Sequence, residues 1–133
     1  GGSEIVASVD KDYLAKNKSG KLDDVISYEN DTDYDAGTTV TELRVYKGKN
    51  LTIKAVDGYT ITKVEFTCTK NCGVKQGFYT TSPVSVDAGA TSTSAGSDNV
   101  GTITVSGNTA TVKYTASENQ MRVTKLAVTY KAK

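Results

Sequence analysis

The sequence contains no histidine and no tryptophan, and it has a single proline. Without histidine, the commonest general base, the Ser–His and Cys–His nucleophile pairs and almost all zinc sites are excluded. A glycosidase could use two carboxylates, but it needs them about 5 to 10 Å apart in a cleft, and no acidic pair lies among signals for one. Glycine-rich phosphate loops are also missing. We therefore expect a protein that is not an enzyme and has no catalytic residues.

The sequence also has no marked excess of one sign of charge, because 16 basic and 15 acidic side chains leave a formal net charge of +1. No overall field attracts nucleic acid or anionic lipid, so neither is an expected partner. No stretch reaches the ~18 consecutive apolar residues of a membrane span, and the N-terminus lacks the basic and apolar regions of a signal peptide. Gly1-Gly2-Ser3 is typical of a cloning remnant, which leaves room for a removed signal. The length of 133 residues predicts one domain, over residues 4–133, and we expect a monomer.

The chain is instead rich in Thr, Val, Ser and Gly, and its apolar residues alternate with polar ones in short runs. This pattern predicts about nine strands, with a short helical turn or a loop over residues 11–24. The strands are expected at residues 4–9, 25–28, 42–46, 51–55, 60–68, 80–86, 100–105, 109–114 and 121–130. Without helical crossovers they favour an all-β fold, an antiparallel β-sandwich of jelly-roll or immunoglobulin-like type, with a closed barrel as the alternative.

Glycine-containing turns near residues 48–50, 57–58 and 107–108 tolerate positive φ and predict three hairpins. The hairpins would span residues 42–55, 51–68 and 100–114. Residues 87–99 (DAGATSTSAGSDN) have no large apolar side chain to bury. We expect this segment to be an exposed, mobile loop.

An internal repeat relates residues 51–67 (LTIKAVDGYTITKVEFT) to residues 112–129 (VKYTASENQMRVTKLAVT). Each copy has an alternating strand, a polar turn and then the pattern apolar-Thr-Lys-apolar-x-apolar-Thr. The apolar phase shifts by one residue at Thr62-Lys63 and again at Thr124-Lys125. Because such a shift would turn half of each strand to the wrong face, we predict a β-bulge at each Thr-Lys pair.

Three segments resemble a known kind of module: ELRVYKGKNLTIKA (42–55), GYTITKVEFTC (58–68) and ENQMRVTKLAVTY (118–130). They are similar to an accessory module of secreted and cell-surface multidomain proteins of gut Firmicutes and Bacteroidetes. The likeness implies a non-catalytic, carbohydrate-binding-module-like β-sandwich joined to polysaccharide-degrading enzymes or adhesins. It also implies a secreted or cell-surface location, with other domains of the same chain as partners. Two functions stay open: binding of a polysaccharide or cell-surface glycan, or a structural spacer or protein-interaction role.

The loop after the second cysteine is the strongest ligand-site candidate, with Lys75, Gln76, Phe78 and Tyr79. Aromatic faces stack on sugars, while amides and charged groups bond the hydroxyls. Adjacent residues of an extended chain point to opposite faces. We therefore expect one of the two aromatic residues to join the core and the other to meet solvent or ligand; the alternative is that both cap the core.

Arg44 and Tyr46 form a second candidate, because they alternate with Leu43 and Val45 and so share the outer face of one strand. An outward Arg-Tyr pair can stack on a sugar ring. Cross-strand packing of an exposed arginine on a tyrosine is the alternative reading.

Asp31, Asp33 and Asp35 alternate in the acidic stretch ENDTDYDAGTTVTE, with Glu42 eleven residues after the first. This spacing matches positions 1, 3, 5 and 12 of a helix–loop–helix calcium loop, but Ala36 takes the glycine position and strands replace the helices. The remaining hypothesis is a structural calcium ion between strands, against a solvated acidic turn. No other cofactor is expected.

Cys68 and Cys72, in CTKNC, are the two cysteines. Cys68 continues the apolar phase of its strand, so we expect it to face the core. A disulfide across this tight turn is one prediction, if the two Cα atoms lie within about 7 Å. Two separate thiols are the other.

Overall fold

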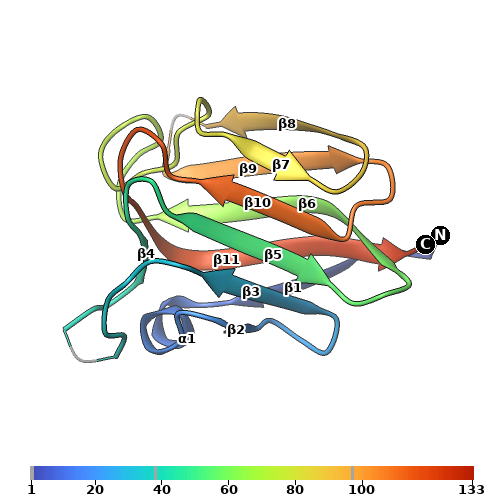
Figure 1. Ribbon diagram of the computed structural model, residues 1–133, viewed down its shortest axis with the longest axis horizontal. Helices are drawn as coiled ribbons and strands as arrows, with labels where there is room; N and C mark the ends of the chain where they lie inside the picture. The colour runs from blue at the N-terminus through green and yellow to red at the C-terminus, as the bar shows by residue number, and fades with distance from the viewer. Residues whose placement is uncertain (1, 38, 97) are drawn as a thin grey trace.

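The structure is a computed structural model that describes residues 2–37, 39–96 and 98–133. Gly1 of the predicted remnant, Thr38 of the acidic stretch and Ser97 of the predicted loop lie outside the described residues. Eleven strands and one helix follow the chain in the described part (Figure 1). They are β1 (Ile5–Val9), α1 (Lys11–Lys16), β2 (Gly20–Lys21), β3 (Ile26–Asn30), β4 (Leu43–Val45), β5 (Asn50–Ala55), β6 (Tyr59–Cys68), β7 (Val84–Val86), β8 (Ala90–Ala95), β9 (Val100–Ser106), β10 (Thr111–Thr115) and β11 (Met121–Ala132).

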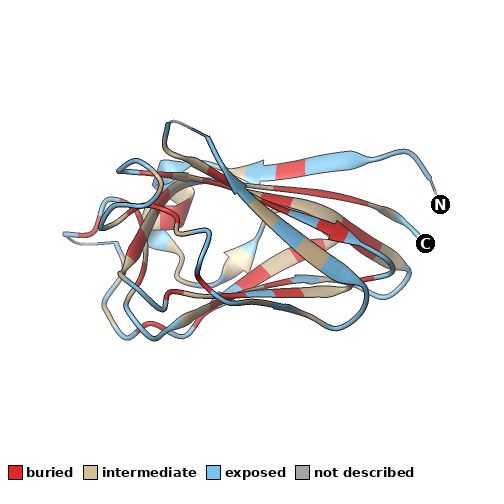
Figure 2. Cartoon of the chain, turned by 90° about the horizontal axis from the view of Figure 1, so that it is seen from above, coloured by how far each residue is buried: buried red, intermediate tan, exposed pale blue. Residues whose placement is uncertain are grey.

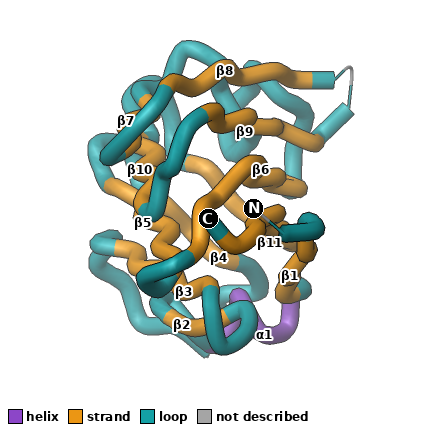
Figure 3. Tube along the Cα trace, turned by 90° about the vertical axis from the view of Figure 1, so that its right-hand side faces the viewer, coloured by secondary structure: helices purple, strands orange, loops and turns teal. Residues whose placement is uncertain are grey.

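The strands form two antiparallel sheets. One has the order β1-β11-β6-β9-β8, with β4 also paired to β11, and the other has the order β2-β3-β5-β10-β7. Figure 3 shows the two sheets as two rows of strands seen end on. The all-β class is thus confirmed, and the two layers are consistent with a β-sandwich.

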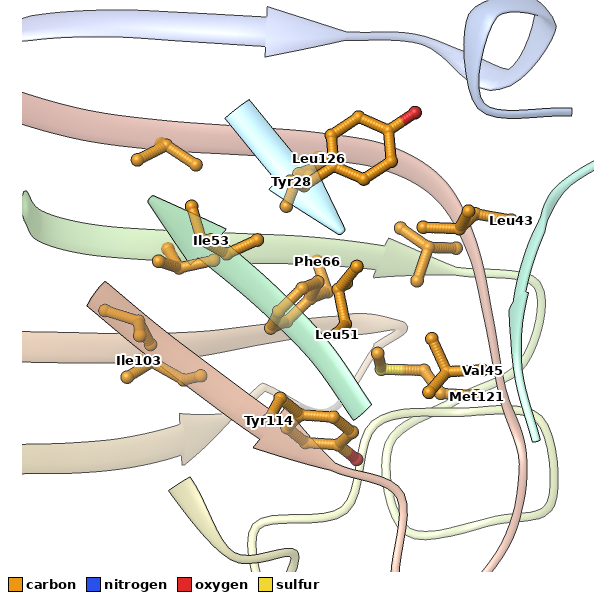
Figure 4. Close-up of a cluster of buried hydrophobic side chains, with 14 of the residues drawn as sticks. Tyr28, Leu43, Val45, Leu51, Ile53, Phe66, Ile103, Tyr114, Met121 and Leu126 are labelled. Carbon is orange, nitrogen blue, oxygen red and sulfur yellow. The ribbon is translucent and has the colours of Figure 1, made fainter. Parts of the chain in front are cut away.

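One hydrophobic core lies between the sheets, built from alternate residues of their strands (Figures 2 and 4). Ile53 and Tyr114 of the five-stranded sheet and Phe66 and Leu126 of the six-stranded sheet are all buried. The rings of Phe66 and Tyr114 lie 5.6 Å apart, centroid to centroid. Burial of apolar side chains from both layers is the main favourable term in such a fold.

The segment after β1 is helical, which settles the choice between a helical turn and a loop. The Asp10 side chain caps α1 by accepting a hydrogen bond of 3.3 Å from the Tyr13 N–H. Such a cap satisfies one of the helix's unpaired N–H groups. Leu14 fastens the helix to the core, since its side chain is fully buried.

All three predicted hairpins are wrong. The two strands of each expected pair, β4 with β5, β5 with β6 and β9 with β10, belong to different sheets. The turns themselves form as expected, because Gly48, Gly58 and Gly107 have φ values of 85°, 92° and 87°. Each turn therefore carries the chain across the core to the opposite sheet. A positive-φ turn reverses the chain, but it does not decide which strand becomes the hydrogen-bonding partner.

Both predicted bulges are confirmed where β6 pairs with β11. Thr124 is the extra residue at one bulge and Thr62 at the other, because the neighbours of each pair with consecutive residues of the opposite strand. The threonine hydroxyls donate hydrogen bonds across the strand pair, from Thr124 to the Thr67 carbonyl (3.2 Å) and from Thr62 to the Thr129 carbonyl (3.3 Å). The two copies of the repeat thus pair with each other, and each supplies one bulge.

Residues 87–99 are not a loop, because β8 lies within them and pairs with β9 over its whole length. Most of its side chains are exposed, as expected of that segment. The strand was not evident in the sequence because an edge strand is held by backbone hydrogen bonds on one side and needs no large apolar residue. The two-residue strand β2 was likewise not predicted.

Candidate functional site

The loops that bear the predicted ligand residues gather at one end of the molecule, opposite the two termini (Figure 1). The termini lie side by side, and the Gly2 N–H donates to the Ala132 carbonyl at 3.4 Å. Residues 69–83, between β6 and β7, and residues 116–120, between β10 and β11, belong to the loop-bearing end. Residues 31–37 and 39–42, between β3 and β4, complete it.

Phe78 is part of the core. Its side chain is fully buried and stacks on Phe66 and Tyr114, with ring centroids 5.8 and 5.4 Å away. Gly101 leaves the space for this ring, because a Cβ atom there would lie 2.1 Å from the Phe78 Cγ. The expectation that one aromatic of the pair joins the core is confirmed. Phe78 also lies at the floor of the cavity beside Tyr79, so its role in ligand binding stays a prediction.

Tyr79 points the other way and is half-buried at the wall of a cavity of about 380 Å³. Its hydroxyl accepts a hydrogen bond of 3.0 Å from the Asn119 amide, and its backbone N–H donates to the Tyr114 hydroxyl at 3.4 Å. These bonds fix the ring beside the cavity. The lining also includes Cys72, Thr80, Thr81, Ala95 and Glu118.

The polar groups of this cavity suit a ligand rich in hydroxyl groups. The Thr81 hydroxyl donates to the Glu118 carboxylate, and Thr80 lies beside it on the exposed side. A carboxylate accepts hydrogen bonds and a threonine hydroxyl can donate and accept them, while the tyrosine ring offers an apolar face. The arrangement can therefore bind a small polar molecule that also has an apolar C–H surface.

Gln76 joins the predicted loop to the start of β11. Its N–H donates to the Gln120 carbonyl (3.1 Å), and its carbonyl accepts from the Arg122 N–H (3.0 Å). Its φ of 75° lies in the left-handed region, where a non-glycine residue costs about 1 to 3 kcal/mol. The two hydrogen bonds stabilise this conformation, and they place the loop against β11. Lys75, next to it, is exposed.

Arg44 and Tyr46 lie on the outer face of the six-stranded sheet, as the alternation predicts, because Leu43 and Val45 are buried and these two are half-buried. Arg44 lies directly opposite Arg122 in the pairing of β4 with β11. A carboxylate joins the two guanidinium groups: Glu42 Oε2 is 3.3 Å from Arg44 Nε, and Glu42 Oε1 is 4.0 Å from Arg122 Nη1.

Glu42 is held as an anion beneath the two arginines. Burial alone would raise its pKa, but the hydrogen bond from the Thr41 N–H (3.0 Å) and the charges of Arg44 and Arg122 outweigh burial. The pKa of Glu42 therefore lies below its ordinary value. The carboxylate stays ionised while its side chain is nearly inaccessible to solvent.

Two tyrosines border this arginine pair. The rings of Tyr34 and Tyr46 lie 5.7 Å apart at an angle of 43°, and Lys18 Nζ lies 5.0 Å from the centre of the Tyr34 ring. The Tyr34 hydroxyl accepts a hydrogen bond from the Arg44 N–H (3.1 Å), and the Thr32 hydroxyl accepts one from the Tyr46 N–H (3.1 Å). Alternate residues of the acidic stretch thus cover the free edge of β4.

The aspartates of the acidic stretch are not assembled as a metal site. Asp31 accepts two hydrogen bonds of 2.7 Å from Asn50, one from its backbone N–H and one from its side chain. Burial raises the pKa of Asp31, but these bonds outweigh it and lower the pKa. Asp33 and Asp35 are exposed. Among the described residues, no three His, Cys, Asp or Glu side chains lie close enough to hold a metal ion. Thr32 and Tyr34, between the aspartates, are instead bonded to β4. A structural calcium ion at this stretch stays a prediction.

Both cysteines are free thiols in the structure. Cys68 faces the core as expected, and burial raises its pKa to about 12. Cys72 is half-buried at the cavity, and burial, with the nearby Asp98 carboxylate, raises its pKa as well. A disulfide between them remains a prediction, which a mass measurement of the non-reduced protein checks.

Sequence reasoning placed Arg44 and Tyr46 on one face but did not join them to Glu42 and Arg122 as one cluster. Glu42 was assigned to a strand start or to a calcium loop but to no arginine cluster, and Glu118 and Asn119 were not predicted as site residues. The missing information was the pairing of β4 with β11, because those strands are far apart in the chain. The available signal was the alternation of Arg122 with Met121 and Val123, because it places Arg122 on an outer face, as it does Arg44.

The one helix in the described residues is not long or apolar enough to cross a membrane. Comparison with known proteins adds no relative: no family model matches the chain, and neither a curated protein nor a solved structure matches it.

Proposed function

We propose that this chain is a non-catalytic binding module for carbohydrate, a polysaccharide or a cell-surface glycan, that works in secreted or surface-attached proteins. We infer a β-sandwich of jelly-roll or immunoglobulin-like type that presents its ligand site at the loop-bearing end. The observation that supports the proposal most is the cavity beside Tyr79, where an aromatic face and hydrogen-bonding groups meet.

The chemistry of the cavity fits a sugar. A pyranose ring has an apolar C–H face that packs on an aromatic ring and hydroxyls that need donors and acceptors at its rim. Tyr79 supplies the ring, while Thr80, Thr81 and Glu118 supply the polar groups. The volume of about 380 Å³ lies at the small end of the range of ligand sites, roughly 300 to 1,000 Å³, which suits a short stretch of glycan.

The position of the site supports the same proposal. Both termini lie at the far end of the molecule, so a neighbouring domain joined at either terminus would leave the loop-bearing end facing outward (Figure 1). In this arrangement the other domains of the same chain would be covalently joined at the termini, and the loops at the opposite end would bind the glycan.

Tyr79→Ala tests the proposal. In electrophoresis through gels that contain neutral polysaccharides such as galactan, arabinan and dextran, at least one should retard the wild type. The substitution should abolish this retardation, because the sugar loses the aromatic ring on which it packs, while Tyr79→Phe should keep most of it. Tyr59→Ala is the matched control, since Tyr59 is also half-buried but lies at the terminus-bearing end. Equal retardation of Tyr79→Ala and wild type would contradict the proposed site.

A spacer or protein-interaction domain is the second candidate function, and β8 favours it. This strand is at the end of its sheet, pairs only with β9 among the described strands, and has neither charge nor proline in its sequence ATSTSA. Sheet edges are usually protected by such residues, and an open edge can accept a strand from a partner. If no polysaccharide, neutral or acidic, retards the wild type, this function replaces carbohydrate binding.

A further inference from the structure

The outer face of β4 and β11 holds an arrangement that folding alone would not favour. Arg44 and Arg122 lie directly opposite each other across the strand pair. Like charges in directly opposed positions destabilise a sheet. The single carboxylate between them, Glu42, balances one of the two charges, so the cluster keeps a net charge of about +1.

Glu42 holds the two guanidinium groups in place rather than exposing its own charge. Its side chain is 6% exposed, while those of Arg44 and Arg122 are 22% and 23% exposed. A molecule approaching this face therefore meets the two cations and not the anion. Lys18, above the neighbouring Tyr34 ring, adds positive charge at the border.

The guanidinium groups also keep donors for a ligand. Each has five N–H groups, and in the described chain the Nε–H of Arg44 donates to Glu42 (3.3 Å) and that of Arg122 to Gln120 (3.0 Å). Arg122 Nη1, at 4.0 Å from Glu42, is beyond hydrogen-bond range. These contacts fix the planes of both guanidinium groups while most of their terminal N–H groups stay available. A guanidinium group held in one plane can donate two parallel hydrogen bonds to the oxygens of a carboxylate or sulfate.

This cluster is connected to the proposed sugar site. Glu118 and Asn119 contact the Tyr79 region, and Gln120 and Arg122 follow directly on the same segment. Gln76, from the loop that ends at Tyr79, is bonded to the backbone of Gln120 and Arg122. A glycan chain that occupies the Tyr79 cavity thus has the arginine pair on the same end of the molecule.

We propose that Arg44 and Arg122, held by Glu42, bind an anionic substituent, a carboxylate or sulfate, of an acidic polysaccharide. This inference rests on the proposed carbohydrate function and names the class of glycan. Tyr34 and Tyr46 would pack on the sugar ring that bears the anion. An acidic glycan should therefore bind more tightly than a neutral one of the same length, and salt should weaken this advantage by screening.

The test compares three ligands: polygalacturonate for carboxylate, dextran sulfate for sulfate, and the neutral polysaccharide bound by wild type. Arg44→Gln with Arg122→Gln should raise the Kd for the acidic ligand about tenfold or more and leave the neutral ligand unchanged. The preferred acidic ligand identifies the anion. Lys54→Gln with Lys113→Gln is the matched control, because it removes the same charge from the exposed outer face of the other sheet.

Removing both arginines leaves Glu42 buried without a partner, so the double variant could be poorly folded. The triple variant that adds Glu42→Gln avoids this charge, and Arg44→Lys with Arg122→Lys keeps the charge but removes the planar fork. Both should be folded by circular dichroism and should lose affinity for the acidic ligand. A purely structural cluster would change the melting temperature without changing the ratio of acidic to neutral affinity.

The outcomes separate the two proposals. Unchanged acidic binding in the folded arginine variants overturns the arginine site and leaves the Tyr79 site intact. An equal loss of acidic binding in the control Lys54→Gln with Lys113→Gln does the same. Loss of neutral binding in Tyr79→Ala supports the Tyr79 site whatever the arginine variants do. Absence of acidic binding by the wild type overturns the arginine site, and absence of all glycan binding overturns both.

Discussion

At the scale of single residues, alternation along the chain decided which candidate side chains can reach a ligand. The expectation that Phe78 and Tyr79 point to opposite sides was correct, and so was the outward placement of Arg44 and Tyr46. Which of the two aromatics is buried could not be predicted, because it depends on the space above Gly101. That space exists only after β9 has paired with β6.

Gly101→Ala should destabilise the protein by about 2 to 4 kcal/mol, because the added methyl group would overlap the Phe78 ring. The ring has no room to move, since Phe66 and Tyr114 stack on it. Urea denaturation measures the loss.

Phe78→Leu in the same chain should recover part of this loss, so the two substitutions should be non-additive. Each single variant is the control for the pair. Simple addition of the two losses would show that the methyl group and the ring do not collide.

Glu42 should make the protein sensitive to acid. Its pKa is lowered in the folded state, so its contribution to stability is complete above the ordinary value of about 4.3 and is lost as pH falls through the lowered value. Wild-type stability should therefore drop on acidification below about pH 5 more steeply than that of Glu42→Gln. Thermal melting between about pH 3 and pH 6 checks this, with Glu29→Gln on an exposed side chain as the control. Parallel curves for wild type and Glu42→Gln would contradict the role of Glu42 as a buried anion.

At the scale of elements, both bulges and most strand positions followed from the sequence, whereas β2, β8 and the strand partners did not. A one-residue change of apolar phase is a local signal, so Thr62 and Thr124 could be identified before any pairing was known. Which strands pair with each other is set by the burial of both sheets against one core. The residues of a local turn carry no information about that burial. The three expected hairpins failed for this reason.

Deletion of Thr124 should be tolerated, at a cost of about 1 to 2 kcal/mol, because the residues on either side already face consecutive residues of β6. The deletion removes the bulge and keeps Val123 and Leu126 on the buried face. Deletion of Ala127, three residues later, should instead unfold the protein, since it would turn Val128 and Tyr130 outward. Circular dichroism and urea denaturation compare the two variants. Similar stability of both would show that the bulge does not absorb the phase shift.

At the scale of the whole molecule, the all-β class and the antiparallel layers were predictable from composition and alternation, and the position of the site was not. Gathering of the loops opposite the termini results from the order in which strands cross between the sheets. The arginine cluster has the same origin, because β4 meets β11 only in the folded chain. Residues that looked separate in the sequence thus share one end of the molecule.

Backbone amide chemical shifts during titration with the retarding glycan test most directly whether the loop-bearing end binds carbohydrate. We expect saturable shifts for residues 73–81 and 118–120, around Tyr79 and Glu118, and none for residues 56–60 and 107–110 at the opposite end. Tyr79→Ala should remove the shifts while leaving the rest of the spectrum folded. Saturable shifts confined to the terminus-bearing end, or to the β8 edge, would contradict the proposed site.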